Sequence, residues 1–157
     1  MQPKTLRRID FARSLGAAVA LQAALEQPPA GRWCWSPFTS VTAMGWHHQP
    51  LQYALFGCWA IGARYDSLGK IGGLRCPLLI FHGERDALVP LAMGRRLFER
   101  APEPKRFHLI PGAGHNDTLR HGGTAARRHG GTAARRHGGA AYWKQWRALV
   151  ERLPSEN

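Results

Sequence analysis

The chain has 157 residues, of which 44% are hydrophobic, and this length and composition indicate one globular domain rather than a disordered or fibrous chain. Lysine and arginine number 22 against 10 aspartates and glutamates, and the resulting net charge of +12 favours acidic partners such as nucleic acid or an anionic membrane. No run of about 18 apolar residues occurs, so we expect no transmembrane helix.

The predicted elements alternate between strand and helix in chain order. The sequence predicts a strand at Leu6–Phe11, a helix at Leu15–Glu26, strands at Arg32–Trp35 and Cys76–His82, a helix at Leu91–Arg100, a strand at Arg106–Ile110 and a helix at Tyr142–Leu153. Residues 41–65 are rich in Trp and His and show no clean periodicity. The alternation predicts an α/β fold with a partial, mostly parallel sheet of about four strands and crossover helices. The strand at Cys76–His82 is a continuous apolar run, as in a parallel sheet that is covered on both faces.

An octapeptide repeat interrupts this pattern near the C-terminus. Arg-His-Gly-Gly-Thr-Ala-Ala-Arg occurs at 120–127 and again at 128–135, and its glycine pairs predict a mobile loop. We therefore divide the chain into a core at 1–119, an Arg/His/Gly tandem-repeat insertion at 120–141, and a C-terminal helix and tail at 142–157.

The repeat leaves two binding alternatives to weigh. It concentrates arginine in a glycine-rich loop, which is also a pattern of RNA or other polyanion binding; we do not expect nucleic acid to be the principal partner. Its histidines recur every eight residues without a fixed helix to hold them, so we expect no metal there. They are His121, His129 and His137.

Two features bear on the compartment. The three cysteines have no CxxC spacing and are expected to be buried thiols in a reducing compartment. Arg7-Arg8 followed by the small apolar run Leu15–Leu25 imitates a twin-arginine export signal. The same residues fit a catalytic turn, so we expect a cytoplasmic protein and keep export as the alternative.

Ser14 lies where a strand is expected to pass into a helix. In Ala12-Arg13-Ser14-Leu15-Gly16 the serine has the spacing of a nucleophile elbow, the sharp strand-to-helix turn that leaves a serine hydroxyl clear of the sheet. Ala12 stands where the usual pattern has glycine, and small neighbours let other backbone approach closely. The alternative interpretation is a serine that caps the helix N-terminus.

An aspartate and a histidine follow two later strands. Asp86 comes just after the strongest strand, and His115 lies in a glycine-flanked loop after the last strand. An aspartate there can fix the tautomer of an imidazole, and a histidine can accept a serine proton near neutral pH. Taken singly, they are also typical of a turn aspartate and an exposed loop histidine. The order Ser, Asp, His after successive strands favours a hydrolase triad.

These motifs resemble the α/β-hydrolase superfamily, and the similarity covers nearly the whole chain apart from the repeat. The closest subgroup is the serine hydrolases that include the abhydrolase-domain depalmitoylases. The resemblance implies Ser14 as nucleophile, His115 as general base, Asp86 as orienting acid and the Leu15 backbone N–H as an oxyanion donor, with no cofactor or metal. The segments that carry it are 12–20, Ser36-Pro37-Phe38-Thr39-Ser40, Arg64-Tyr65-Asp66-Ser67-Leu68, 76–90 and Pro111–Asp117.

The early strands of that family, and the loop that supplies its second oxyanion N–H, have no counterpart in this sequence. We therefore expect the C-terminal half of the fold, with the first strand left as an apolar edge that favours self-association or complementation by a missing front half. The expected substrate is a small acyl ester or thioester. The alternative function is an inactive hydrolase remnant that binds polyanions or a partner.

Overall fold

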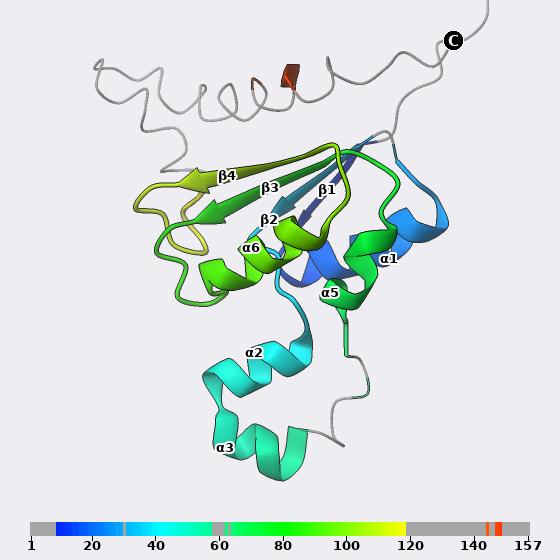
Figure 1. Ribbon diagram of the computed structural model, residues 1–157. Helices are drawn as coiled ribbons and strands as arrows, with labels where there is room; N and C mark the ends of the chain where they lie inside the picture. The colour runs from blue at the N-terminus through cyan, green and yellow to red at the C-terminus, as the bar shows by residue number, and fades with distance from the viewer. Residues whose placement is uncertain are drawn as a thin grey trace, which may run out of the picture.

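The computed structural model describes residues 9–29, 31–57, 62, 64–118, 144 and 147–148. The elements in chain order are β1 (Ile9–Arg13), α1 (Leu15–Glu26), β2 (Gly31–Trp35), α2 (Val41–His48), α3 (Pro50–Gln52), the π-helix η1 (Tyr53–Gly57), α5 (Ser67–Lys70), the 3₁₀ helix η2 (Ile71–Gly73), β3 (Leu78–Gly83), α6 (Leu91–Arg100) and β4 (Lys105–Ile110) (Figure 1). The predicted repeat at 120–141 lies outside these residues, as does most of the predicted C-terminal helix.

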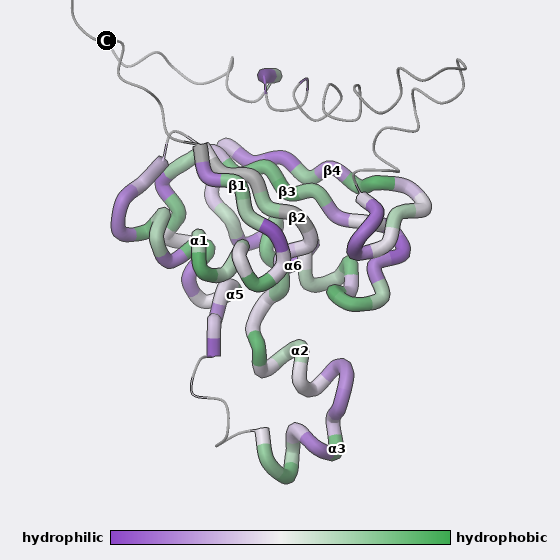
Figure 2. The backbone as a smooth tube through the Cα atoms, turned by 180° about the vertical axis from the view of Figure 1, so that it is seen from behind, coloured by the Kyte–Doolittle hydropathy of each residue, from purple (hydrophilic) through white to green (hydrophobic). Residues whose placement is uncertain are grey.

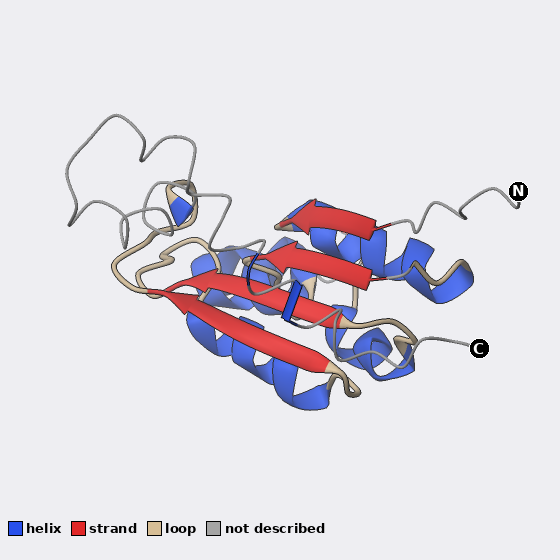
Figure 3. Cartoon of the chain, turned by 90° about the horizontal axis from the view of Figure 1, so that it is seen from above, coloured by secondary structure: helices blue, strands red, loops and turns tan. Residues whose placement is uncertain are grey.

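The four strands form one parallel sheet in the order β1-β2-β3-β4. Arg13 pairs with Trp35, Trp35 with Phe81, and Phe81 with His108, so the carboxyl ends of all four strands reach the same edge of the sheet (Figure 3). The predicted partial parallel sheet with crossover helices is confirmed. The segments that follow the strands therefore meet along one edge, where ligands of open α/β sheets bind.

Several strand boundaries differ from the prediction by one residue, and two differ by two residues for identifiable reasons. The sequence predicted that the first strand ends at Phe11, but β1 continues through Arg13 because the ladder with β2 pairs its last two residues. β3 begins at Leu78 rather than Cys76. Pro77 has no N–H to donate to a ladder, and the Leu78 N–H donates to the Pro104 carbonyl at 3.1 Å. The extension of β1 places Ser14 directly at the sheet edge.

Helices α1, α5 and α6 lie on one face of the sheet (Figures 1 and 3). The face of α1 toward the sheet carries small residues, so its backbone can lie close to the strands. The core includes Ala17, Leu21 and Ala24 of α1, Ala12 and Cys34 of the first two strands, Leu78 and Ile80 of β3, and Leu97 of α6. Every residue of β3 is buried, which confirms the strand as one covered on both faces.

Residues 41–57, whose sequence shows no clean periodicity, form a compact helical hairpin that we call the α2–η1 hairpin. Its helices are too short for a periodic apolar pattern, but their start signals are local. The Ser40 Oγ caps α2 by accepting from the Ala43 N–H at 3.0 Å, and Pro50 occupies the first turn of α3. The hairpin projects away from the sheet (Figures 1 and 2).

Candidate active site

Ser14 is the single residue between β1 and α1. Its backbone has φ of 50° and ψ of −120°, a strained conformation for a residue with a side chain, and such strain is typical of a nucleophile elbow. The helix starts through the Ser14 carbonyl, which accepts from the Ala17 N–H at 3.0 Å. Ser14 occupies the N-cap position of α1, as the alternative interpretation expected, but its side chain makes no capping hydrogen bond.

The neighbours of Ser14 match the expected elbow in part. Leu15 is the first helical residue, and its N–H therefore has no acceptor within the helix and is available to a ligand oxygen. Ala12 is buried in the core. The close approach expected at Gly16 is not found, because an added Cβ there would meet nothing within 4 Å in the described part of the chain.

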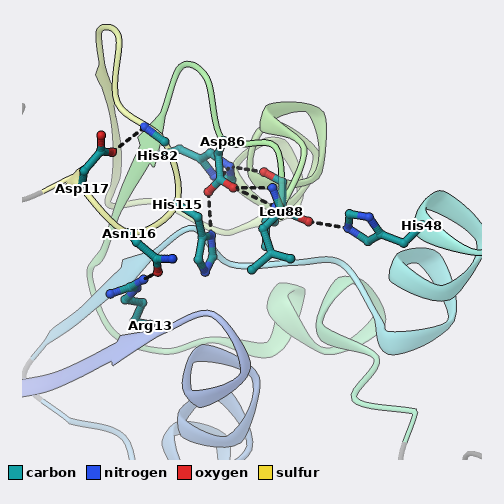
Figure 4. A network of polar contacts seen from close by, with 10 residues as sticks. Arg13, His48, His82, Asp86, Leu88, His115, Asn116 and Asp117 are labelled. Carbon is teal, nitrogen blue, oxygen red and sulfur yellow. Dashed lines mark hydrogen bonds and ion pairs between the residues drawn. The ribbon is translucent and has the colours of Figure 1, made fainter.

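Asp86 lies in the loop after β3, and its carboxylate accepts three hydrogen bonds. Oδ1 accepts from the backbone N–H groups of Leu88 at 3.0 Å and Val89 at 2.8 Å. Oδ2 lies 2.8 Å from Nδ1 of His115 (Figure 4). The two backbone donors hold one oxygen, so the other is held in position for the imidazole.

The loop after β4 that carries His115 is tied to its surroundings by backbone groups. The Gly114 N–H donates to Oδ1 of Asp117 at 2.6 Å, and the Ala113 carbonyl accepts from the Arg85 N–H at 2.8 Å. The Gly112 N–H donates to Glu84 at 2.8 Å. Gly112 has φ of 69°, which favours glycine at that point of the turn. These bonds join the loop of His115 to the loop of Asp86.

Electrostatics favour an ionised Asp86 and one tautomer of His115. Burial acts to raise the pKa of Asp86, but the nearby Ser36 hydroxyl, the Val89 N–H and His115 together outweigh it and hold the pKa below its usual value. The Ser36 Oγ is close enough to favour the charge without completing a hydrogen bond. An ionised carboxylate only accepts, so the His115 Nδ1 donates to it. Nε2 then carries the lone pair that a general base needs.

The elbow and the histidine loop are joined by neighbours of the predicted catalytic residues. The Arg13 guanidinium donates to the side-chain carbonyl of Asn116, which links the residue before Ser14 to the residue after His115 (Figure 4). Asp86 and His115 are thus in contact, and Ser14 lies at the same sheet edge. No hydrogen bond joins Ser14 to His115 in this structure, and in the absence of substrate catalytic hydrogen bonds are often loose.

The chain is similar in sequence and in fold to several known proteins. No family model matches the chain. An uncharacterized protein of Mycobacterium tuberculosis is 40% identical over 110 residues, which cover 68% of this chain and 37% of that protein. Alpha/beta hydrolase domain-containing protein 17B of Homo sapiens is 27% identical over 114 residues, covering 73% of this chain and 37% of that protein. The crystal structure of the esterase domain of a Rhodothermus marinus protein has a TM-score of 0.59 at 22% identity, covering 90% of this chain and 60% of that one.

The chain shares the α/β-hydrolase fold and is similar in sequence to α/β-hydrolase domain-containing proteins. The matches to α/β-hydrolase domain-containing proteins fit the depalmitoylase-like subgroup that the sequence resembles. A metagenomic α/β-hydrolase from the Medee basin, MGS-M2, shares the fold with a TM-score of 0.59 at 14% identity, covering 96% of this chain and 67% of that one. The present chain spans about 37% of the length of the first curated relatives. It therefore represents part of an α/β-hydrolase fold.

One residue of this candidate site was missed by the sequence analysis. His82, on β3, is fully buried, and its Nε2–H donates to the Val89 carbonyl at 2.9 Å. Burial lowers the pKa of His82, which keeps the imidazole neutral. The ring thereby supports the loop of Asp86 from inside the core. The sequence feature that could have indicated this role is a polar residue within an otherwise apolar strand. Gly83 follows His82 directly, and Asp86 lies four residues after His82.

The remaining sequence predictions about metals and spans can be compared with the described residues. Among them, no cluster of His, Cys, Asp or Glu could hold a metal ion. No described helix is long and apolar enough to cross a bilayer. The repeat histidines considered as metal ligands lie outside the described part. His47 and His48 are exposed and form the last two residues of helix α2.

Proposed function

We propose that this α/β-hydrolase chain hydrolyses an ester or thioester through a Ser14–His115–Asp86 triad. The observation that carries the proposal is the 2.8 Å hydrogen bond between His115 Nδ1 and Asp86 Oδ2, at the same sheet edge as the strained Ser14. A carboxylate that orients a histidine, beside a serine in an elbow, is the arrangement that activates a serine hydroxyl.

In the proposed reaction, the Ser14 Oγ attacks the carbonyl carbon while His115 Nε2 accepts the hydroxyl proton. The tetrahedral intermediate places its negative oxygen beside the Leu15 N–H. His115 then gives the proton to the departing alcohol or thiol, and an acyl-enzyme remains on Ser14. A water molecule activated by His115 attacks this ester and releases the acid. Asp86 stays ionised throughout and stabilises the imidazolium that forms twice in the cycle.

The size of the chain bears on the expected rate. We assign one oxyanion donor, Leu15, to the described residues, and a second donor is typical of the fold class. The loss of one donor costs about 10²–10³ in turnover. We therefore expect slow turnover from the 157-residue chain and faster turnover when a segment that supplies a second N–H is fused or co-expressed. The substrate is proposed only as a small acyl ester or thioester.

A fluorophosphonate probe tests the nucleophile, because it reacts with an activated serine without needing an acyl pocket. We expect wild-type protein to be labelled and Ser14→Ala to lose labelling, since removal of such a nucleophile costs about 10⁶ in rate. Ser40→Ala is the control: the Ser40 Oγ caps α2 by accepting from the Ala43 N–H and is not part of the proposed triad, so labelling should persist. Equal labelling of wild type and Ser14→Ala would contradict the assignment.

The net charge of +12 supports a second candidate, an inactive remnant that binds a polyanion. If the protein is such a remnant, we expect no fluorophosphonate labelling of the wild type. We also expect its affinity for nucleic acid to fall steeply as the salt concentration is raised. Labelling that depends on Ser14, with no salt-dependent binding, would exclude it.

A further inference from the structure

We infer that the α2–η1 hairpin docks the protein onto a lipid bilayer that carries anionic headgroups. The inference concerns a surface outside the proposed triad and does not depend on catalysis. It rests on the exposure of large apolar side chains at the tip of the hairpin, on the way the tip is held rigid, and on the charge of this part of the chain.

Four large apolar side chains are exposed within eleven residues of the hairpin. Leu51 is 73% exposed and Phe56 is 68% exposed, and Leu55 and Trp46 are each more than half exposed. Single exposed apolar residues are common on protein surfaces, but a group of large ones marks a binding surface. The hairpin projects from the body of the molecule, which leaves this group accessible (Figures 1 and 2).

The hairpin is a packed structure rather than a loose loop. The Tyr53 ring lies between Gly45 and Gly57, and a Cβ on either glycine would overlap it. The Tyr53 hydroxyl donates to Thr42 Oγ1 at 3.1 Å, and the ring packs edge-on against Trp46 with centroids 5.6 Å apart. The apolar tip is therefore presented in a defined shape.

The base of the hairpin is fixed to the core. Val41, Ala43 and Met44 pack against a buried cluster that includes Phe38 and Val89. At the other end of α2, His48 Nε2 donates to the Leu88 carbonyl at 2.7 Å, two residues beyond Asp86. The hairpin is thus connected through α2 to the loop that holds the acid of the proposed triad, and docking would bring that loop close to the bilayer.

The charge distribution favours a bilayer over a second copy of the chain. Residues 41–65 contain no aspartate or glutamate, and the exposed Arg64 follows the hairpin. Tryptophan and other large apolar residues on a surface that lacks acidic side chains and has an arginine nearby are compatible with interfacial binding to anionic lipid. A symmetric dimer through the same tip would bring together two chains that each carry a net charge of +12, which repel one another.

Vesicle flotation tests the inference, because vesicle-bound protein rises in a density gradient whereas aggregates sediment. The full chain is mixed with phosphatidylcholine vesicles with or without phosphatidylserine. We expect flotation with the anionic vesicles, and a drop of at least about tenfold in the partition coefficient for the double variant Leu51→Glu/Phe56→Glu. Leu51→Gln/Phe56→Gln is a milder pair that should also lower flotation, and circular dichroism checks the fold of each variant.

Matched controls separate the hairpin from other surfaces. Val19→Glu/Ala23→Glu adds the same charge on the exposed face of α1 and should bind vesicles like wild type. Deletion of 121–136 removes most of the basic repeat and should leave the dependence on Leu51 and Phe56 intact. The inference is overturned if wild type does not float, if the hairpin variants bind unchanged, or if the α1 control loses binding equally. It is also overturned if the hairpin variants reduce only the mass seen by light scattering, which would assign the tip to a second copy.

Discussion

Replacement of Asp86 by Asn isolates the orienting role of the carboxylate from its structural role. In the variant, Oδ1 can still accept from the Leu88 and Val89 N–H groups, which lie 3.0 Å and 2.8 Å away in the parent protein. The amide Nδ2 then faces His115 at the site of the present 2.8 Å hydrogen bond, where two donors would meet. The imidazole must adopt the other tautomer, with the proton on Nε2, and can no longer accept the proton of Ser14.

The expected loss follows from this change of tautomer. The same substitution in a Ser-His-Asp triad lowers turnover about 10⁴-fold, which corresponds to roughly 5.5 kcal/mol of transition-state stabilisation. The cost in folding stability should be much smaller, about 1–2 kcal/mol, because one charge-assisted hydrogen bond is replaced and two are weakened but kept. Asp86→Asn should therefore be folded at room temperature but unreactive.

The second-order rate constant of fluorophosphonate labelling measures this loss, because it requires only the attack step. Asp66→Asn is the control: it makes the same chemical change at the N-cap of α5, where the side chain accepts from the Gly69 N–H at 2.9 Å. That variant should react at the wild-type rate. If Asp86→Asn retains labelling within about tenfold of wild type while Ser14→Ala loses it, Asp86 does not orient the base and the argument from the hydrogen bond is wrong.

Three further outcomes follow from the packing of His82 and from the repeat. Gly94→Ala should lower the free energy of unfolding by about 1–3 kcal/mol, because the added Cβ overlaps the buried His82 ring, whereas Gly72→Ala, which meets nothing within 4 Å, should have little effect in the same urea titration. Burial lowers the pKa of His82, so as pH falls below about 6.5 the unfolded chain binds a proton more readily than the folded protein. The melting temperature should therefore fall from pH 7 to pH 5, and it should fall less in His82→Gln. An equal fall in wild type and in His82→Gln would argue against this cause. Deletion of 121–136 should change stability by only about 1 kcal/mol, and loss of cooperative unfolding on deletion would show that the repeat packs on the core.

The sequence alone was sufficient for the elements whose signals are local and continuous. The bounds of α1 and α6 agree with the prediction, because residues close to the helix ends mark where each helix starts or stops. Pro28 follows the end of α1, and Pro90 precedes the start of α6. β3 was recognised from its apolar run. The order of Ser14, Asp86 and His115 after successive strands also follows from the chain, since parallel strands bring their carboxyl ends to one edge.

Other features depend on contacts between residues far apart in the chain, and only the tertiary structure decided them. The Arg13–Asn116 hydrogen bond joins residues 103 positions apart, and nothing local indicates it. The pKa of His82 is lowered because the fold buries its ring against α6, whereas the sequence shows only a polar residue in an apolar strand. Burial and long-range pairing are properties of the packed molecule, so an isolated segment cannot reveal them. For the same reason the sequence predicted which residues gather at the sheet edge, but the structure alone determined that Asp86 faces His115 and that the α2–η1 hairpin is connected to their loop.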